Sequence, residues 1–171
     1  MGYIASATRI SSLTVGGVDY TSAFTDWQVS DDSAYNNGCI KTQGTLRLGS
    51  YPGGPLIEDY DRNNFKRGVE VILDMKQPDG TTYRHPRGLL YVISTSYDVE
   101  AESLEVELGC KLSLMSLTDR IDDLIAILPV QLDVAQTSFA NCSAAFASLG
   151  QYVYQDNTGA LRTVGLYDGD T

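Results

Sequence analysis

The clearest pattern in this sequence is an alternation of apolar and polar positions between residues 87 and 115. The first run places larger or apolar side chains at every second position, at Leu89, Tyr91, Ile93, Thr95, Tyr97 and Val99. After a short acidic connection, the second run continues at Leu104, Val106, Leu108 and Cys110. A period of two is typical of a strand with one face in a core, and two such strands across a short connection predict an antiparallel hairpin. We expect this hairpin to be the centre of a mainly β fold.

Shorter strands are predicted before this hairpin, at residues 10–15, 18–20, 25–31, 39–48 and 69–75. Gly16 and Gly17 can adopt the positive φ angles of a tight turn, so the first two strands should form a small hairpin. Gly44, inside a strand, suggests a bulge or a close backbone approach. The stretch 50–68 is rich in Pro, Gly, Asn and charge. A loop of this length in a compact domain is usually functional or forms an interface.

After Met115 the apolar positions follow the period of an α-helix. Leu117, Ile121, Leu124 and Leu128 are spaced 4, 3 and 4 apart, which predicts a helix over 117–132. Asp133 can cap a second helix, whose apolar face would consist of Ala135, Phe139, Cys142, Phe146 and Leu149. A final hairpin is expected around residues 156–159. These features divide the chain into a β domain over 1–116, the helix over 117–132 and an incomplete second unit over 133–171.

Composition narrows the possible functions. The formal net charge is -10, which argues against binding of duplex DNA because such binding depends on Lys and Arg. No apolar run reaches the roughly 20 residues that span a bilayer, so we expect no membrane insertion. Cys39, Cys110 and Cys142 are too widely spaced for a paired metal site, and buried free thiols are expected.

A lone histidine and an acidic group are candidates for chemistry. His85 is the single histidine, and without a partner motif it is more readily a surface residue than a catalytic base. An acidic group, Asp119, Asp122 and Asp123, fits a solvated helix face better than a metal site.

A partial calcium-loop pattern falls in the stretch 58–70. Asp59, Asp61 and Asn63 hold its first ligand places and Glu70 its twelfth, but Asn64 stands where the pattern needs Gly. We expect no catalytic residue, metal or cofactor, and leave open whether the loop 50–68 binds a metal.

Basic side chains gather at Arg62, Lys66, Arg67, Arg84 and Arg87 in an otherwise acidic chain. They are either scattered surface charges or a basic edge that meets an acidic edge of a neighbouring subunit. Tyr51, Tyr60 and Phe65 would then be the aromatic anchors of that subunit interface, since buried aromatics dominate interface energies.

The order of these elements resembles the N-terminal hub domain of tail-tip and baseplate proteins of long-tailed bacteriophages. The resemblance is carried by SLTVGGVDYT (12–21), FKRGVEVIL (65–73), the Pro78-Asp79-Gly80 turn, and GLLYVISTSYDVEAESLEVELGCKLSLM (88–115) with the following helix. The segment FANCSAAFASLGQYVYQDNTGALRTVGL (139–166) is similar to the helix and hairpin that open the next domain of those proteins.

The resemblance implies an antiparallel tail-tube-like β-barrel or sandwich with a flanking helix, followed by a helix and a C-terminal hairpin. It also implies a virion protein, assembled in the host cytoplasm, that forms a homotrimeric ring and joins the tail tube or a distal tail protein to a fibre or spike protein. Such a protein would be structural and not an enzyme, and DNA would pass through it without specific binding. On this resemblance we expect only the first tube-like domain to fit fully in this sequence.

Two further expectations follow. In a ring, the polar face of the long hairpin, formed by Ser94, Ser96, Asp98, Glu105 and Glu107, would line the channel, because neutral or negative groups do not hold DNA. The alternative is that this face is ordinary outer surface. A rival function is a β-sandwich that binds carbohydrate or a host surface through exposed tyrosines, at Tyr51, Tyr60, Tyr83, Tyr97 and Tyr167.

Overall fold

The computed structural model describes residues 10–32, 38–49, 65–98, 100, 102–118 and 120–165. The chain forms two compact units, Met1–Val29 with Gly44–Leu108 and Ser30–Gln43 with Gly109–Thr171. These boundaries differ from the predicted division at residue 116, because the segment 30–43 belongs with the C-terminal part of the chain. The predicted division was based on the local periodicity of the sequence, and this periodicity does not show that the segment 30–43 packs with residues far along the chain.

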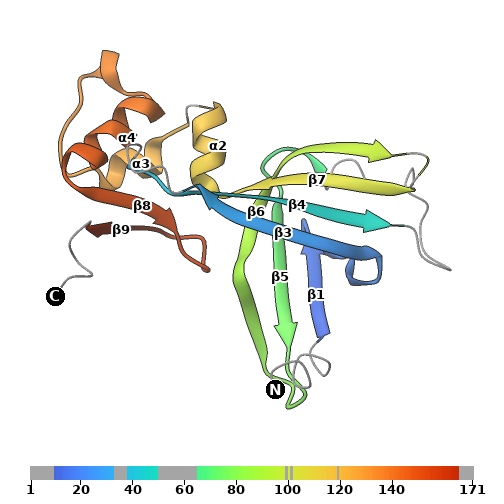
Figure 1. Ribbon diagram of the computed structural model, residues 1–171. Coiled ribbons are helices and arrows are strands. Elements are labelled where there is room, and N and C mark those ends of the chain that lie inside the picture. Colours follow the sequence, from blue (N-terminus) through green and yellow to red (C-terminus); the bar gives the residue numbers. More distant parts are fainter. Residues whose placement is uncertain are drawn as a thin grey trace. The chain divides into compact units, whose positions relative to one another are not determined.

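Seven strands in the described residues form one sheet in the order β2-β1-β5-β6-β7-β4-β3 (Figure 1). Their bounds are β1 (Ile10–Val15), β2 (Val18–Asp19), β3 (Phe24–Asp32), β4 (Lys41–Gly49), β5 (Glu70–Lys76), β6 (Thr82–Asp98) and β7 (Ser103–Gly109). A short 3-10 turn, η1 (Thr21–Ala23), precedes β3. The pairs β1–β2, β1–β5 and β5–β6 are antiparallel.

The small N-terminal hairpin forms as predicted. Val15 pairs with Val18 across the turn, and the turn residues Gly16 and Gly17 have φ angles of 58° and 81°. Directly after the hairpin, the Asp19 carboxylate accepts the backbone N–H of Thr21 at 2.8 Å and so holds the start of η1.

A bulge of four residues in β6 interrupts its pairing with β5. Ile72 pairs with Leu89 and Asp74 with Arg84, so the four residues 85–88 of β6 stand opposite Leu73 alone. Gly88 is required here, because a Cβ at this position would lie 2.3 Å from the carbonyl oxygen of Leu73. The strand therefore runs without a break from Thr82 through the bulge to Asp98, whereas the sequence pattern indicated a separate short strand at 81–84 before the alternating stretch.

The buried positions of the long hairpin follow the prediction in β7 but not in β6. Leu104, Val106 and Leu108 of β7 are at most 1% exposed. In β6, the prediction that the odd-numbered residues alone form the buried face is wrong. The even-numbered Leu90 and Val92 are also buried, at 1% and 0% exposure, and residues 94–98 are all exposed. Successive residues in the middle of β6 point to opposite faces of the sheet and are nevertheless buried, so both faces are covered there.

The second unit contains the helices α2 (Lys111–Thr118), α3 (Asp122–Ile127) and α4 (Phe139–Ser148), the 3-10 turn η4 (Val134–Gln136) and the hairpin β8 (Gln151–Gln155) and β9 (Leu161–Gly165). This hairpin and the mainly β, antiparallel fold with few helices confirm the predicted fold class. None of the helices in the described residues combines the length and apolar character of a membrane span.

The predicted single helix over 117–132 is wrong. Ile121 has φ -115° and ψ 18°, so the chain leaves helical geometry there and α3 starts afresh. Ile121 and Leu124 are buried as expected, but Leu117 is 54% exposed. The 4, 3, 4 spacing thus comes from two short helices and not from one continuous face.

The second predicted helix starts later than expected. Ser138 caps α4, because its Oγ accepts the backbone N–H of Asn141 at 3.2 Å. Asp133 instead precedes η4 without a capping side-chain hydrogen bond. Gly150, with φ 68°, follows the end of α4 in the left-handed conformation that is typical of this position.

Candidate functional site

The best-defined candidate site is a pocket in the second unit, built around the segment Gly38–Lys41. Gly38 has φ +65°, and a Cβ there would lie 2.1 Å from the carbonyl oxygen of Ser143 and 2.7 Å from the backbone nitrogen of Ala147. The backbone of Gly38 is therefore pressed directly against α4, which only glycine permits.

Strand β8 holds the same segment from another side. Val153 donates its N–H to the carbonyl of Gly38 at 2.9 Å, and Ile40 donates to the carbonyl of Val153 at 2.8 Å. These bonds form a parallel bridge between Cys39 and Val153. Both residues are buried, at 2% and 0% exposure, so the backbone position of Cys39 is fixed.

The start of α2 fixes the chain just beyond. The N–H of Cys110 donates to the carbonyl of Thr42 at 3.0 Å, and the Ser113 hydroxyl donates to the same oxygen at 3.3 Å. The first N–H of α2, at Lys111, donates to Oε1 of Gln155 at 2.7 Å. Helix α2, helix α4 and strand β8 thus hold one short stretch of chain between them.

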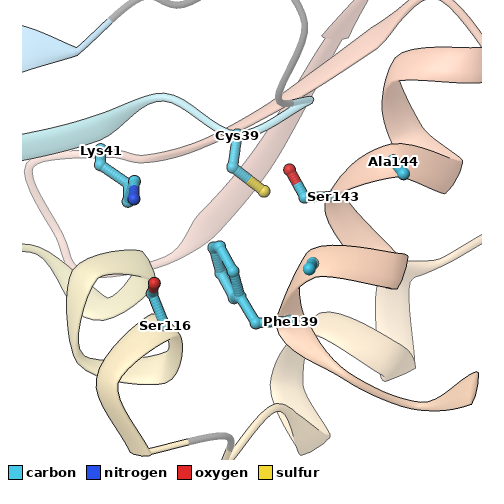
Figure 2. A pocket seen from close by; sticks show the side chains of 7 residues that line it. Cys39, Lys41, Ser116, Phe139, Ser143 and Ala144 are labelled. Atoms are coloured by element: carbon cyan, nitrogen blue, oxygen red, sulfur yellow. The ribbon is translucent and has the colours of Figure 1, made fainter.

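The pocket has a volume of about 280 Å³. This is just below the roughly 300–1,000 Å³ of small-molecule sites, so it suits one side chain or a small ligand. Figure 2 shows the side chains that line it, with the Cys39 sulfur and the Ser143 hydroxyl facing each other. The lining residues are Cys39, Lys41, Ser116, Phe139, Ala140, Ser143 and Ala144.

The pocket contains one formal charge. Burial raises the pKa of the Cys39 thiol, and the contact with Ser143 and the charge of Lys41 offset this only in part, so the thiol is neutral at neutral pH. A neutral buried thiol is a poor nucleophile and a poor metal ligand. The ammonium of Lys41 lies 5.9 Å from the centroid of the Phe139 ring, within the range of a cation–π contact.

Ser143 is the unusual member of the pocket. The residue is 5% exposed, and its buried hydroxyl interacts with the Cys39 thiol but makes no hydrogen bond of standard geometry among the described residues. Sequence reasoning missed this site. In the sequence, Ser143 is recognisable only as a serine on a predicted helix, beside the apolar positions Cys142 and Phe146. That pattern does not indicate a pocket.

The predicted interface residues have different surroundings. Tyr51, Tyr60 and Arg62 lie outside the described residues. Phe65 is only 6% exposed, and its ring packs 5.3 Å from that of Tyr20 in the same unit, which leaves little of it for a subunit contact.

The basic residues of that prediction are exposed or bonded within the first unit. Lys66 and Arg87 are exposed. Arg67 donates from Nε to the carbonyl of Ile93 at 3.2 Å, and Arg84 pairs with Asp74 at 2.7 Å. Their role at a subunit interface stays a prediction.

Two residues of the predicted channel face come together. Ser94 donates its hydroxyl to the Glu107 carboxylate at 2.7 Å, so these side chains share one face of the hairpin. Glu105 pairs with Arg47 at 3.2 Å, with both side chains about half exposed. Arg47 was not foreseen there, and it reduces the negative charge of the face. Ser96 and Asp98 are exposed, and the channel position of all five residues stays a prediction.

The other candidate groups acquire no site in the described residues. Nδ1 of His85 lies 2.9 Å from the carbonyl oxygen of Pro86, within the bulge of β6. Asp122 and Asp123 are exposed in the first turn of α3, and no cluster of three metal-binding side chains occurs in the described ranges. Asp119 and the calcium-loop residues 58–64 lie outside them.

The tyrosines of the rival function do not form a platform in the described residues. Tyr83 and Tyr97 are 50% and 39% exposed, but they lie near opposite ends of β6. Tyr51, Tyr60 and Tyr167 lie outside the described residues.

A scan against known protein families finds no match, and neither does a search of curated protein sequences. In fold, the chain is similar to the 43 kDa tail protein of prophage MuSo2 from Shewanella oneidensis, with a TM-score of 0.52 and 13% sequence identity. The similarity covers 92% of this chain and 55% of that chain. This chain thus spans about half the length of the tail protein, with which it shares a fold.

Proposed function

We propose that this chain is a structural part of a bacteriophage tail, and more narrowly of the hub at the tail tip or baseplate. The observation that supports this proposal is the fold similarity to a prophage tail protein along nearly the whole chain. The order of sequence elements points the same way independently, because it resembles tail hub proteins. In this role the chain is part of the virion, catalyses no reaction and needs no cofactor.

The proposed arrangement is a homotrimeric ring around the tail channel. Its neighbours would be the tail tube or a distal tail protein on one side and a fibre or spike protein on the other. The formal net charge of -10 supports a channel that DNA crosses without being held, because DNA binding requires an excess of Lys and Arg. Within the ring, we assign the face of Ser94, Glu105 and Glu107 to the channel.

The test is to locate the chain in the particle. Tails purified from the phage or prophage are labelled with a gold-conjugated antibody raised against this chain and imaged by electron microscopy. We expect label at the distal end of the tail only. Label along the whole tube would indicate a tube subunit, and tails without label would contradict the proposal.

A mass measurement tests the ring. Light scattering from the released hub should give three copies of the chain. A monomer that binds glycan would instead favour the rival carbohydrate-binding function.

A further inference from the structure

The turn before α4 carries an aliphatic side chain that the second unit leaves uncovered. Val134, the first residue of η4, is 91% exposed, the highest value among the large apolar residues that the structure describes. Its backbone is held in place, because its carbonyl accepts the Thr137 hydroxyl at 2.7 Å and the Thr137 N–H at 3.4 Å. A group held in this way loses little conformational freedom when a partner covers it, so Val134 is suited to insert into a recess on another surface.

The surroundings of this side chain indicate the chemistry of that surface. Ile125, Ile127 and Val130 precede it and are 36–42% exposed, so apolar groups are repeatedly exposed between α3 and η4. Asp133, its direct neighbour, is exposed, and no Lys or Arg occurs between residues 121 and 161. Protein surfaces that bind lipid carry Lys and Arg around their apolar groups, so a lipid surface does not fit. The partner that fits is an apolar recess with a cation at its edge.

The pocket in the second unit is such a recess. Cys39 and Ser143 are 2% and 5% exposed and form its floor. This floor is uncharged, since the neutral thiol and the hydroxyl interact with each other. Ala140 and Ala144, one turn apart on α4, are exposed and form its mouth, and the Phe139 ring is its apolar wall. The volume of about 280 Å³ suits one aliphatic side chain.

Lys41 supplies the cation at the edge of the recess. Its ammonium lies 5.9 Å from the centroid of the Phe139 ring, and Figure 2 shows the two side chains next to each other. It makes no ion pair with any residue that the structure describes. A carboxylate that arrives together with an aliphatic side chain would therefore meet an unpaired cation beside the apolar wall.

We propose that Val134 of one copy inserts into this pocket of a second copy, with its Asp133 carboxylate beside Lys41 of that second copy. Local complementarity supports a second copy as the partner, because an aliphatic side chain next to an acid matches an apolar recess next to a cation. Val134 does not fill the pocket of its own copy, since it is exposed there. The two surfaces differ, so the contact is heterologous, and heterologous contacts that close form a ring. The inference thus rests on the proposed ring and deepens it.

Disulfide trapping tests the geometry of the contact. The full chain with Val134→Cys is mixed with the full chain with Ala144→Cys, oxidised glutathione is added as the electron acceptor, and the linked peptides are identified by mass spectrometry. A disulfide between positions 134 and 144 can only join two copies, because each chain carries only one of these substitutions. We expect this disulfide well above the level in the control mixture of Val18→Cys with Ala144→Cys, since Val18 is 44% exposed but lies in the first unit.

Sedimentation equilibrium of the full chain tests the chemistry of the contact. Val134→Ser should raise the dissociation constant of self-association roughly 10- to 100-fold, the effect of no longer burying one aliphatic side chain. It should leave the thermal midpoint unchanged, because Val134 is exposed in the free chain. Val18→Ser is the matched control and should change neither quantity.

A charge exchange tests the ion pair. Asp133→Lys and Lys41→Asp should each weaken self-association, because each places two like charges next to each other. Both substitutions in one chain should restore it, since the attraction returns with the signs reversed.

Different outcomes overturn different statements. A 134–144 disulfide no more abundant than the control, an unchanged dissociation constant in Val134→Ser, or no restoration by the charge exchange would overturn this inference. The released hub could then still contain three copies by light scattering, which would leave the proposed ring intact. A chain that is monomeric both alone and in the released hub would overturn the inference and the ring together, while the gold label would still test the location in the tail. Binding of phosphatidylglycerol vesicles that is lost in Val134→Ser, without self-association, would overturn the inference in favour of a lipid surface.

Discussion

The close approach of Gly38 to α4 makes a quantitative prediction about the substitution Gly38→Ala. A methyl group there would lie 2.1 Å from the carbonyl oxygen of Ser143, against 3.4–4 Å for an ordinary contact. The backbone must therefore move by about 1.3 Å to reach even the shortest ordinary contact, and this movement breaks the two hydrogen bonds with Val153. We expect a loss of about 1–2 kcal/mol from the left-handed conformation and ~0.5–1.5 kcal/mol for each bond, or ~2–5 kcal/mol in all.

Gly17→Ala is the matched control. Gly17 also has a positive φ angle, of +81°, but a Cβ there would meet nothing within 4 Å. It should therefore lose only the conformational part, about 1–2 kcal/mol. The comparison isolates the collision with α4 from the backbone strain that both positions share.

Urea unfolding with two signals measures both variants. Trp27, the single tryptophan, lies in the first unit, whereas α2, α3 and α4 all lie in the second. Tryptophan fluorescence therefore reports on the first unit and circular dichroism at 222 nm mainly on the second. Gly38→Ala should lower the midpoint of the dichroism signal by more than Gly17→Ala lowers the midpoint of the fluorescence signal. If Gly38→Ala costs no more than Gly17→Ala, the close packing of this segment against α4 is refuted.

Three other substitutions test separate features. Leu108→Ala should destabilise the protein by about 2–5 kcal/mol in thermal unfolding, because Leu108 is 1% exposed. Its exposed neighbour is the control, since Glu107→Ala should change the stability by less than about 0.5 kcal/mol. Equal thermal midpoints for the two variants would contradict the strand assignment. Ser138→Ala should cost about 1 kcal/mol through loss of the α4 cap, measured by loss of helical dichroism on heating. Hydrogen bonds from Thr158 and Arg162 hold the pKa of Asp156 well below its ordinary 3.8. These hydrogen bonds should stabilise the β8–β9 hairpin fully above pH 3.8, and the stabilisation should be lost as the pH falls below 3.8. In amide hydrogen exchange, the variant Asp156→Asn should show little of this pH dependence.

Much of the architecture could be predicted because it depends on neighbouring residues. The double glycine at 16–17 and the strict alternation of β7 each point to one local structure, and both form as expected. The separate helices α2 and α3 could not be predicted in the same way. Ile121 keeps a helical spacing with Leu124 and Leu128 although its backbone is not helical, and only tertiary packing decides where one helix ends.

The pocket depends on contacts that sequence periodicity does not encode. Gly38 and Ser143 are 105 positions apart, and nothing local in either segment indicates that they touch. Likewise, the acidic face of the hairpin was predicted from β6 and β7 alone. Arg47 reaches it because β4 lies next to β7, a neighbour relation that the order of strands in the chain does not reveal.

The segment 30–43 also has a consequence for the time course of folding. Thr42 makes its contacts with Cys110 and Ser113, which follow it by 68 and 71 positions. At about 5–20 residues per second, a ribosome takes roughly 3–14 s to produce these partners after Thr42 itself. Cys39 and Ile40 pair with Val153, which is made later still, so this segment lacks its partner for even longer, and unpaired strands of this kind promote aggregation. A pause in translation after residue 108 would let the first unit fold and lengthen this exposure, so slow synthesis should hinder the second unit specifically.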